Sequence, residues 1–328
     1  MKKCCFIIPY FGKFPNYFQL FLNSCAYNTD FNWLLFTDDF DQFIYPDNVK
    51  VIYVTYEDFK RNIQSHLNFP IVIPTPHKLC DFKPAYGYLF ENYLHDFKFW
   101  GYCDLDIIMG RLNKFLTDDL FDKYDKIFCL GHMTLYKNTY ENNRIFMHRY
   151  KGIELYKKAF TSERTITFDE EWRDEYNVNR IFLAQGKKVF LQDFSMNISV
   201  FHNNFVRIRY VGFDVPNDGH GYIEEEPQKA LYVWEKGNIR RYFMQRNELK
   251  TEDFIYLHLQ KRDMKVDKRI TESSPFKIIP NKFVPLEVDT ITPDNFNKIK
   301  NNGYCFHVQK RQWKAFIRRL ELHFKKLF

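Results

Sequence analysis

The sequence predicts an α/β fold with a mostly parallel central sheet and helices on both faces of that sheet. Short segments that are apolar at nearly every position alternate with amphipathic or polar segments through the first half of the chain. A strand without a polar face is buried on both sides, as happens in parallel sheets that lie between layers of helices. In such sheets, ligands bind beyond the carboxyl ends of the strands.

The first elements alternate as this fold requires. KKCCFIIPYFG predicts a buried strand that ends in a Pro/Gly turn, and apolar residues then recur at helical spacing from Phe18 to Cys25. The next segments are two strands, FNWLLFTDD and NVKVIYVTY, a turn that leads into a helix, CDFKPAYGYLFENYLHDF, and a fourth strand, KFWGYCDLDIIMG. Three of the four strands end in polar or turn residues, which marks that edge of the sheet as a candidate binding site.

The rest of the chain predicts more mixed structure. Residues 126–205 alternate strands and helices again, with one helix expected over residues 143–160. Residues 207–258 are turn-rich and β-like, whereas residues 263–308 are irregular or weakly β and carry prolines at four positions. We therefore expect a main domain over residues 1–262, an irregular extension over 263–308 that packs on it, and a helix over 309–328.

Composition and cysteine usage limit the class of protein. The 328 residues are 45% hydrophobic and 27% charged, which is ordinary for a soluble chain. No apolar run approaches the roughly 20 residues of a membrane span, and the run from Cys4 to Ile8 is too short for a secretory signal. The seven cysteines form no pair of CxxC motifs, so we expect reduced thiols and a cytoplasmic location.

Two aspartates one residue apart, Asp104 and Asp106, follow the fourth predicted strand. Residues i and i+2 of a strand point to the same face, so the two carboxylates are expected to lie together. Solvated acids at a strand end are the plain alternative, because the pattern is short. The apolar sequence on both sides argues for a cation, since ionised carboxylates are costly in such surroundings without one.

The types of residue around this pair indicate which cation and which ligand. Carboxylate oxygens in an incomplete ligand set suit Mg²⁺ or Mn²⁺ that also binds substrate phosphates. His258 could complete the metal site, and Lys261 with Arg262 could hold a diphosphate. Asp81 and Lys83 stand just before a predicted helix and are further candidates.

Seven segments resemble, in their order along the chain, the GT-A class of nucleotide-sugar-dependent glycosyltransferases, and more narrowly the bacterial enzymes that build capsule, lipopolysaccharide and other surface glycans. The segments are IIPYFG, LLFTDD, KLCDFKPAYGYLF, FWGYCDLDIIMGRL, GHMTLYKN, FDEEW and LHLQKR. They span residues 7–262. No single segment is specific, but the joint order is.

The resemblance implies a GT-A (Rossmann-like) catalytic domain over residues 1–262 that moves a sugar from a nucleotide-diphosphate sugar, a UDP-sugar by expectation, to a glycan or lipid-linked glycan. It implies Mn²⁺ or Mg²⁺ held by Asp104, Asp106 and His258, with Asp106 the firmer ligand. The donor-binding residues that it implies are Tyr10, Phe11, Asp38, Asp39, Asp81, Lys83, Asp104, Lys261 and Arg262.

Sugar transfer also needs a group that takes the proton of the acceptor hydroxyl. The segment TFDEEWRDEY offers Asp169, Glu170 and Glu171, of which we favour the first two. The alternative for this cluster is a helix N-terminus, where acidic residues are favoured by the helix dipole. His132 could face the acceptor or have a structural role. No single base stands out, so inversion and retention both remain open.

The last nineteen residues hold seven basic residues and one acidic residue, so the rest of the chain is nearly neutral despite a net charge of +7. This placement argues against nucleic acid as a partner. Apolar residues in the tail form one helical stripe, namely Trp313, Phe316, Ile317, Leu320, Phe324 and Leu327. Such a helix can lie on anionic lipid at the inner face of the cell membrane, or can dock its stripe on the protein body.

Two other functions are weighed against sugar transfer. A nucleotidyltransferase on a related fold usually carries a glycine-rich basic loop after its first strand, whereas IPYFGKFPN holds one glycine. A non-enzymatic protein that binds membrane or nucleic acid would spread its cations over a face rather than gather them in the tail.

Overall fold

The computed structural model describes residues 2–171, 175–212, 221–271, 274–299 and 305–324. Internal contacts divide the chain into two units. Unit 1 comprises residues 1–105, 111–194 and 210–223, and unit 2 comprises residues 106–110, 195–209 and 224–328. This division differs from the expected boundary at residue 262, because strands from 230–254 pair with a strand from the segment 276–279.

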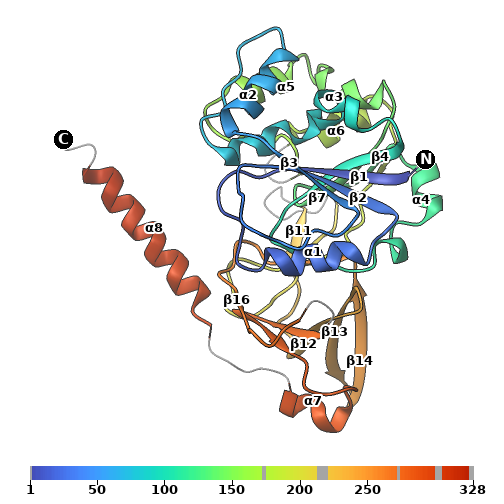
Figure 1. Ribbon diagram of the computed structural model, residues 1–328, viewed down its shortest axis with the longest axis vertical. Helices are drawn as coiled ribbons and strands as arrows, with labels where there is room; N and C mark the ends of the chain where they lie inside the picture. The colour runs from blue at the N-terminus through green and yellow to red at the C-terminus, as the bar shows by residue number, and fades with distance from the viewer. Residues whose placement is uncertain (1, 172–174, 213–220, 272–273, 300–304, 325–328) are drawn as a thin grey trace. The chain divides into compact units, whose positions relative to one another are not determined.

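Unit 1 is a mixed α/β body around a seven-stranded sheet with the strand order β3-β2-β1-β4-β7-β6-β8 (Figure 1). The strands are β1 (Lys2–Pro9), β2 (Phe31–Thr37), β3 (Val49–Tyr53), β4 (Phe97–Cys103), β6 (Lys126–Leu130), β7 (Met133–Lys137) and β8 (Val189–Phe190). Neighbours among β1 to β4 pair in parallel, as do β6 and β8, whereas β7 is antiparallel to both β4 and β6. The sheet is thus large and mostly parallel, as the sequence predicts.

Helices cover both faces of this sheet, with α1 on one side and α2, α3 and α6 on the other (Figure 1). The unit's helices are α1 (Phe18–Ala26), α2 (Tyr56–Ser65), α3 (Tyr86–Leu89), α4 (Asp118–Lys123), α5 (Leu155–Thr161) and α6 (Val178–Ala184). The single helix expected over 143–160 is wrong. A 3₁₀ turn (Asn142–Met147) and α5 replace it, because Lys151 and Gly152 adopt positive φ, which no right-handed helix allows.

Alternation along the buried strands explains why both faces are covered. Cys5 and Ile7 of β1 belong to the core cluster that includes the helices α2, α3 and α6. Phe6, between them, stacks instead on Phe31 and Trp33 of β2. Successive strand residues point to opposite faces, so a strand that is apolar throughout needs a layer on each side.

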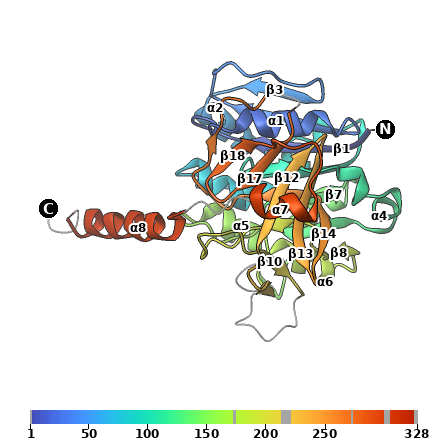
Figure 2. The same cartoon turned by 90° about the horizontal axis from the view of Figure 1, so that it is seen from below.

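Unit 2 is mainly β-structure (Figure 2). Its six-stranded sheet has the order β14-β13-β12-β17-β18-β16, and a second sheet has the order β5-β15-β9. The strands are β12 (Ala230–Glu235), β13 (Asn238–Gln245), β14 (Glu248–Phe254), β16 (Lys265–Val266), β17 (Phe276–Ile279), β18 (Lys282–Pro285), β5 (Ile107–Met109), β9 (Met196–Asn197) and β15 (Tyr256–His258). A two-stranded ribbon, β10 (Ile208–Tyr210) with β11 (Tyr222–Glu224), lies where the chain passes between the units.

Tight turns build the β12-β13-β14 meander. Lys236 and Gly237 form one turn, and Arg246 with Asn247 forms the next; all four residues have positive φ. Two-residue turns of this kind match the twist of antiparallel strands. The segment 263–308, which was expected to be irregular or weakly β, contains β16 to β18 and helix α7 (Pro293–Ile299).

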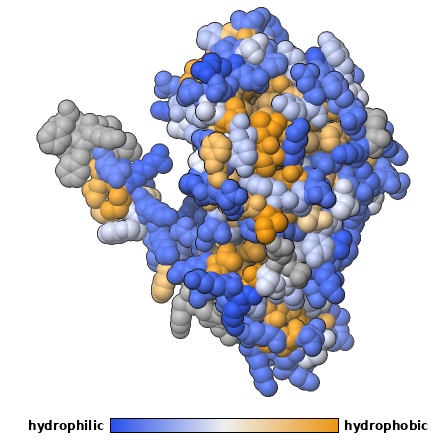
Figure 3. Space-filling view, in the orientation of Figure 1, coloured by the Kyte–Doolittle hydropathy of each residue, from blue (hydrophilic) through white to orange (hydrophobic). Residues whose placement is uncertain are grey.

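Helix α8 (His307–Phe324) follows in the C-terminal segment, where a helix over 309–328 is predicted; residues 325–328 lie outside the described part. Residues 309–321 of this helix are all exposed, and Figure 3 shows apolar residues together on its surface. Within the described residues, no helix is both long and apolar enough to cross a membrane.

Candidate active site

Asp104 directly follows β4, at the carboxyl end of a central strand of unit 1. Its backbone N–H donates to the carbonyl of His132 (3.0 Å), which fixes the main chain at this point. Its carboxylate accepts from Lys83 Nζ (2.9 Å) and is about one-third exposed. The first acid of the predicted pair is therefore held by a lysine and still faces solvent.

Lys83 lies in a 3₁₀ segment (Pro76–Ala85) and connects several groups at this edge of the sheet. Its Nζ also donates to the carbonyl of Gly131 (2.7 Å) and lies 3.5 Å from Asp169 Oδ2 and 5.0 Å from the centre of the Tyr102 ring. Burial by itself would lower the pKa of Lys83, but Asp104 and other anionic neighbours hold it well above its ordinary value. The buried cation thus joins two carboxylates that are far apart in the sequence.

Asp169 is a deeply buried carboxylate at this site, with 3% of its surface exposed. Burial raises its pKa well above the usual range for a carboxyl group, while Lys83 acts in the opposite direction. Tyr102 donates its hydroxyl to the backbone carbonyl of Asp169 (3.2 Å). Asp169 is therefore a carboxyl group whose pKa is raised by its surroundings, a feature of groups that transfer protons.

The neighbouring acids of the same segment differ from Asp169. Glu170 is partly exposed, whereas Glu171 is buried and accepts from Arg180 Nε (2.9 Å). The buried ion pair gives Glu171 a structural role at the start of α6. His132 is also buried, with 5% exposed, beside the backbone of Asp104.

Gly131 is a residue that sequence reasoning missed. A Cβ at this position would lie 2.7 Å from Glu170 Oε2 and 2.9 Å from Asp169 Oδ2. These distances are shorter than carbon–oxygen contact allows, so both carboxylates can approach the strand end only because residue 131 has no side chain. The signal in the sequence is the glycine of GHMTLYKN, which follows a predicted strand.

We expect Gly131→Ala to lower turnover about 10- to 100-fold while the protein stays folded. The added methyl group displaces two flexible carboxylate ends rather than backbone, so the melting temperature should change little, but misplaced acids act poorly. Steady-state kinetics and thermal denaturation measure the two effects. Gly186→Ala, at an exposed turn where an added Cβ meets no atom, is the control for turnover only, because its φ of +70° makes alanine costly for stability there. An unchanged kcat in Gly131→Ala contradicts the assigned role.

In unit 2, Asp106 and His258 face each other across two paired strands. Asp106 precedes β5, which is antiparallel to β15, and Ile107 stands opposite His258 in the pairing. The Nε2 atom of His258 lies 3.2 Å from Asp106 Oδ1. The other carboxylate oxygen, Oδ2, accepts from the backbone N–H of Lys261 (2.8 Å). Both side chains are thus held in place, and the Oδ1 atom of Asp106 and the Nε2 atom of His258 face each other.

The turn after β15 contributes to this arrangement. Gln260 and Lys261 both have positive φ, a conformation that costs free energy in residues other than glycine. The turn aims the amide of Lys261 at Asp106 and leaves the Lys261 side chain exposed. The backbone of Lys261 therefore orients the acid, and its ammonium group remains available to an anionic ligand.

The chemistry of these donors fits a divalent cation. An aspartate oxygen and an imidazole nitrogen, with one more carboxylate two residues away at Asp104, are common ligands of such ions. Leu105 alone separates Asp104 from Asp106, so the extended chain keeps their Cα atoms within about 7 Å of each other. The described residues can therefore supply two carboxylates and one histidine to one ion.

Other predicted donor-binding residues follow the first two strands of unit 1. Tyr10 stacks on Phe14 (5.1 Å between ring centres), and Asp38 accepts from the N–H of Gly12 (2.7 Å); both are partly exposed. Phe11 instead packs in the core against Phe59 (5.1 Å). Of these three predicted residues, Tyr10 and Asp38 have surface to offer a ligand.

Asp39 is buried, with 3% exposed, and accepts from Lys13 Nζ (2.8 Å) and from the N–H of Phe14 (2.9 Å). Burial raises its pKa, but these hydrogen bonds outweigh burial and leave the pKa below its usual value. The contacts give Asp39 a structural role in place of the predicted ribose contact.

Asp81 and Arg262 are also occupied by the protein itself. Asp81 is fully buried, pairs with Lys78 Nζ (2.6 Å) and accepts from the N–H groups of Ile166 and Phe168 (3.0 Å each). It thereby holds the segment that leads to Asp169 and has no surface for a donor sugar.

Arg262 is 3% exposed, and its guanidinium donates to carbonyl groups of the loop 199–204, among them that of Asn203 (3.0 Å). Burial lowers its pKa to about 10. These contacts give Arg262 a structural role in place of the predicted diphosphate contact. Local sequence could not separate it from Lys261, since burial depends on the distant loop.

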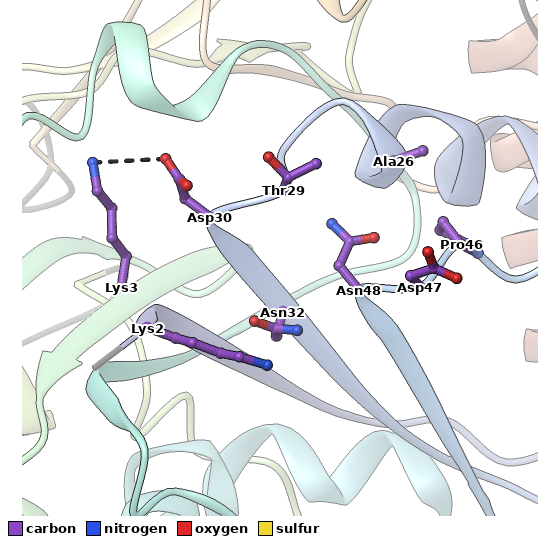
Figure 4. Close-up of a pocket in the computed structure, with 9 residues that line it drawn as sticks. All are labelled: Lys2, Lys3, Ala26, Thr29, Asp30, Asn32, Pro46, Asp47 and Asn48. Atoms are coloured by element: carbon purple, nitrogen blue, oxygen red, sulfur yellow. Dashed lines mark ion pairs between the residues drawn. The ribbon is translucent and has the colours of Figure 1, made fainter.

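A cavity of about 730 Å³ lies where the first strands of unit 1 begin, at the ends opposite to their carboxyl ends (Figure 4). Lys2, Lys3, Asn32 and Asn48 line it, at or near the starts of β1, β2 and β3. Asp104 follows the carboxyl end of β4, which runs parallel to β1, so this cavity is not part of the candidate site.

Fold and side chains together define a mixed α/β protein with acidic and basic groups gathered beyond the carboxyl end of a central parallel strand. The chain belongs to the Family of unknown function (DUF6625), whose family model matches residues 6–287. No curated protein matches the sequence.

Solved structures offer weak likenesses. One is galactosyltransferase LgtC in complex with donor and acceptor sugar analogues, which is 11% identical with a TM-score of 0.32. Another is an active-site mutant of LgtC, which is 13% identical with a TM-score of 0.29. Each covers 59% of this chain and 75% of its own. Because these likenesses are weak, the assignment of a function has to rest on the side chains of the candidate site.

Proposed function

We propose that this protein is a metal-dependent glycosyltransferase that takes a sugar from a nucleotide-diphosphate sugar. The observation that carries the proposal is the approach of His258 Nε2 to Asp106 Oδ1, with Asp104 two residues away in the chain. Two carboxylates and an imidazole suit Mn²⁺ or Mg²⁺, and such an ion would stabilise the negative charge that develops on a nucleoside diphosphate leaving group.

The chain's own residues provide the remaining functions. Lys261 presents an exposed ammonium group beside Asp106 and can contact the diphosphate. Tyr10 and Asp38, which are partly exposed after β1 and β2, are candidates for the base and ribose. UDP is the nucleotide that we expect.

Asp169 is proposed to accept the proton of the acceptor hydroxyl. Its raised pKa makes it a better base than an ordinary carboxylate, while Lys83 acts in the opposite direction and favours the ionised form. Glu170, which is partly exposed beside it, is the second candidate. A surface-glycan precursor is the acceptor class that we expect, either free or linked to a lipid.

Exposed positions on α8 support a membrane partner. Trp313 is 64% exposed, Phe316 50% and Leu320 38%, so the apolar stripe is not docked on the body within the described residues. Arg311, which donates to the carbonyl of Val200, precedes Trp313 by two residues and so lies about 200° away around the helix. On its basic side, Arg311 contacts Val200 of the same unit. The apolar side stays exposed and is proposed to meet anionic lipid.

We expect Trp313→Ser with Phe316→Ser to reduce binding to phosphatidylglycerol-rich vesicles at least tenfold. Each exposed aromatic residue contributes roughly 2 kcal/mol on insertion into lipid, and both can be replaced without disturbing a core. Vesicle pelleting measures the loss, with Phe40→Ser, equally exposed in unit 1, as the control. Unchanged pelleting contradicts the membrane partner, and loss of a dimer in the variant would indicate a second copy of the chain instead.

A panel of nucleotide sugars tests the proposed function directly. We expect one UDP-sugar to raise the melting temperature in the presence of Mn²⁺ and not in its absence. Turnover with that donor should release a nucleoside diphosphate. Release of pyrophosphate would assign a nucleotidyltransferase, and no donor binding across the panel would overturn the proposal.

A further inference from the structure

We infer that Phe40 and Tyr53 form an aromatic platform that binds a sugar ring of a neutral glycan. The inference rests on the proposed function and adds to it a site for a part of the acceptor that is remote from the reacting hydroxyl. Phe40 lies in the connection between β2 and β3, residues 38–48, and Tyr53 is the last residue of β3. Both residues belong to unit 1.

The two rings of the platform are stacked and open to solvent. Their centres lie 4.9 Å apart, and their planes differ by 12°. Phe40 is 69% exposed and Tyr53 is 47% exposed. Because Tyr53 covers one face of the Phe40 ring, so large an exposure leaves the opposite face open. Single exposed apolar side chains are ordinary, but a stacked pair presents a flat apolar surface of the kind that binds ligands.

The connection that carries Phe40 is held against the body of unit 1. Lys13 Nζ donates to Asp39 (2.8 Å) and to Asp41 (2.6 Å), the two neighbours of Phe40 in the chain. Phe43, three residues further on, packs edge-on against an aromatic ring of helix α1, with 4.9 Å between ring centres. The backbone is thus anchored on both sides of Phe40, so little ordering is needed when a ligand binds.

The charge around the platform selects the ligand. Residues 38–48 contain four aspartates and no basic residue, and Lys13 pairs with two of the four. Such a surface disfavours anionic lipid, nucleic acid and acidic polysaccharide. Sugar hydroxyl groups can donate to carboxylates, and the Asp41 side chain beside Phe40 is 56% exposed. The C–H groups on the face of a sugar ring are attracted to the negative face of an aromatic ring. Together these groups suit a neutral sugar.

The position of the platform relates it to the candidate active site. The strands β3, β2, β1 and β4 are neighbours in this order and run parallel, so their carboxyl ends lie at one edge of the sheet. Three strand spacings separate Tyr53, at the end of β3, from the end of β4, a distance of about 14 Å. Asp104 directly follows β4. The platform therefore suits a sugar several units along the glycan from the reacting hydroxyl.

Affinity electrophoresis in native gels tests the inference without metal, donor or turnover. Each gel contains one neutral polysaccharide, namely soluble starch, galactomannan, mannan or hydroxyethylcellulose, and slower migration reports binding. We expect at least one of the four to slow the wild-type protein relative to a gel without polysaccharide. A wild-type protein that none of them slows overturns the inference.

Matched variants separate an aromatic face from a merely apolar surface. Phe40→Ala should weaken binding about tenfold, and Phe40→Leu, which stays apolar but has no ring, should weaken it nearly as much. Phe40→Tyr keeps the ring and should retain binding. Phe40 is exposed, so all three variants should melt as the wild type does. Tyr140→Ala is the control, because Tyr140 is 74% exposed in the same unit and Arg144 lies over its ring.

The outcomes separate this inference from the proposed function. Equal binding by the wild type and Phe40→Ala overturns the inference even if the enzyme transfers sugar. Binding that needs Phe40, in a protein that turns over no nucleotide sugar, supports the platform and contradicts the proposed function. If Phe40→Ala instead weakens UDP binding in calorimetry, the platform holds a nucleobase, and if it instead weakens vesicle pelleting, the platform contacts lipid. Either of these results overturns the inference.

Discussion

Asp106→Asn is expected to reduce sugar transfer at least ~1000-fold and to abolish Mn²⁺-dependent donor binding, while the protein remains folded. The substitution removes the negative charge that faces His258 Nε2 and keeps the shape of the side chain. An amide can still accept from the N–H of Lys261 and can donate its NH₂ group to His258, so the local structure is preserved. A loss of about 4 kcal/mol in transition-state stabilisation corresponds to this change in rate.

Calorimetry with a UDP-sugar, with and without Mn²⁺, measures the binding part of this prediction. Asp263→Asn serves as the matched control, because Asp263 is an exposed aspartate of the same unit whose partner is Lys314 on α8. The control should bind the donor as the wild type does. Metal-dependent donor binding that survives in Asp106→Asn would mean that the ion, if bound, is held elsewhere.

Lys83→Met should lower kcat at least 100-fold and destabilise the protein by about 3 kcal/mol. The lysine, whose side chain is 12% exposed, is the cation between Asp104 and Asp169, and its removal leaves the buried Asp169 carboxylate without a counter-charge. Breaking a buried ion pair by removing one partner is costly because the remaining charge has lost its water as well as its partner. Chemical denaturation and steady-state kinetics measure the two effects.

The loss of stability in Lys83→Met should depend on pH. Burial already raises the pKa of Asp169 above its unfolded value, and without Lys83 the pKa rises further. A carboxyl group with a raised folded-state pKa holds its proton longer in the folded protein, so stability falls as pH rises from its unfolded pKa through its folded pKa. The variant should therefore be closest to the wild type in mildly acidic buffer and furthest from it at neutral pH.

Lys3→Met is the control for this prediction. Lys3 also bridges two aspartates, Asp30 and Asp118, but both carboxylates are exposed, and exposed ion pairs contribute little to stability. Its removal should change the free energy of unfolding much less than Lys83→Met does. Equal losses of stability in the two variants would show that the position of Lys83 has no special effect on stability. An active Lys83→Met enzyme would show that the ion pair of Lys83 with Asp169 is not needed for catalysis.

Much of unit 1 could be predicted from local sequence because its strands are apolar at nearly every position. β1, β2 and β4 form where continuous apolar runs predict them, and α1 buries the spaced apolar face from Phe18 to Cys25. The helix expected over 143–160 failed because Lys151 and Gly152 form a left-handed turn that a pattern of apolar residues does not reveal. For 263–308 the sequence indicated only irregular or weakly β structure, because β16, β17 and β18 are two to four residues long and strands this short carry little periodicity.

Part of the candidate site could likewise be predicted from the sequence, and the other part could not. A pair of acids after an apolar strand is visible in the sequence, and so is the basic, apolar-striped helix near the C-terminus. Lys261 and Arg262 look alike in the sequence, yet the turn after β15 leaves the first exposed while the loop 199–204 covers the second. Asp81 and Asp39 were predicted to meet a ligand and instead hold backbone amides, because each is buried among partners from other segments.

The sequence by itself determined the apolar strands β1, β2 and β4 of unit 1, the two acids at the end of β4 and the charge of the tail, since each depends on residues that are neighbours in the chain. Tertiary structure decided which polar side chains meet: Lys83 with Asp104 and Asp169, and His258 with Asp106 and Asn197. These partners come from separate segments, and burial sets both their pKa values and their exposure. Whether a charged side chain binds a ligand or stabilises the fold is therefore fixed by distant residues that pack around it.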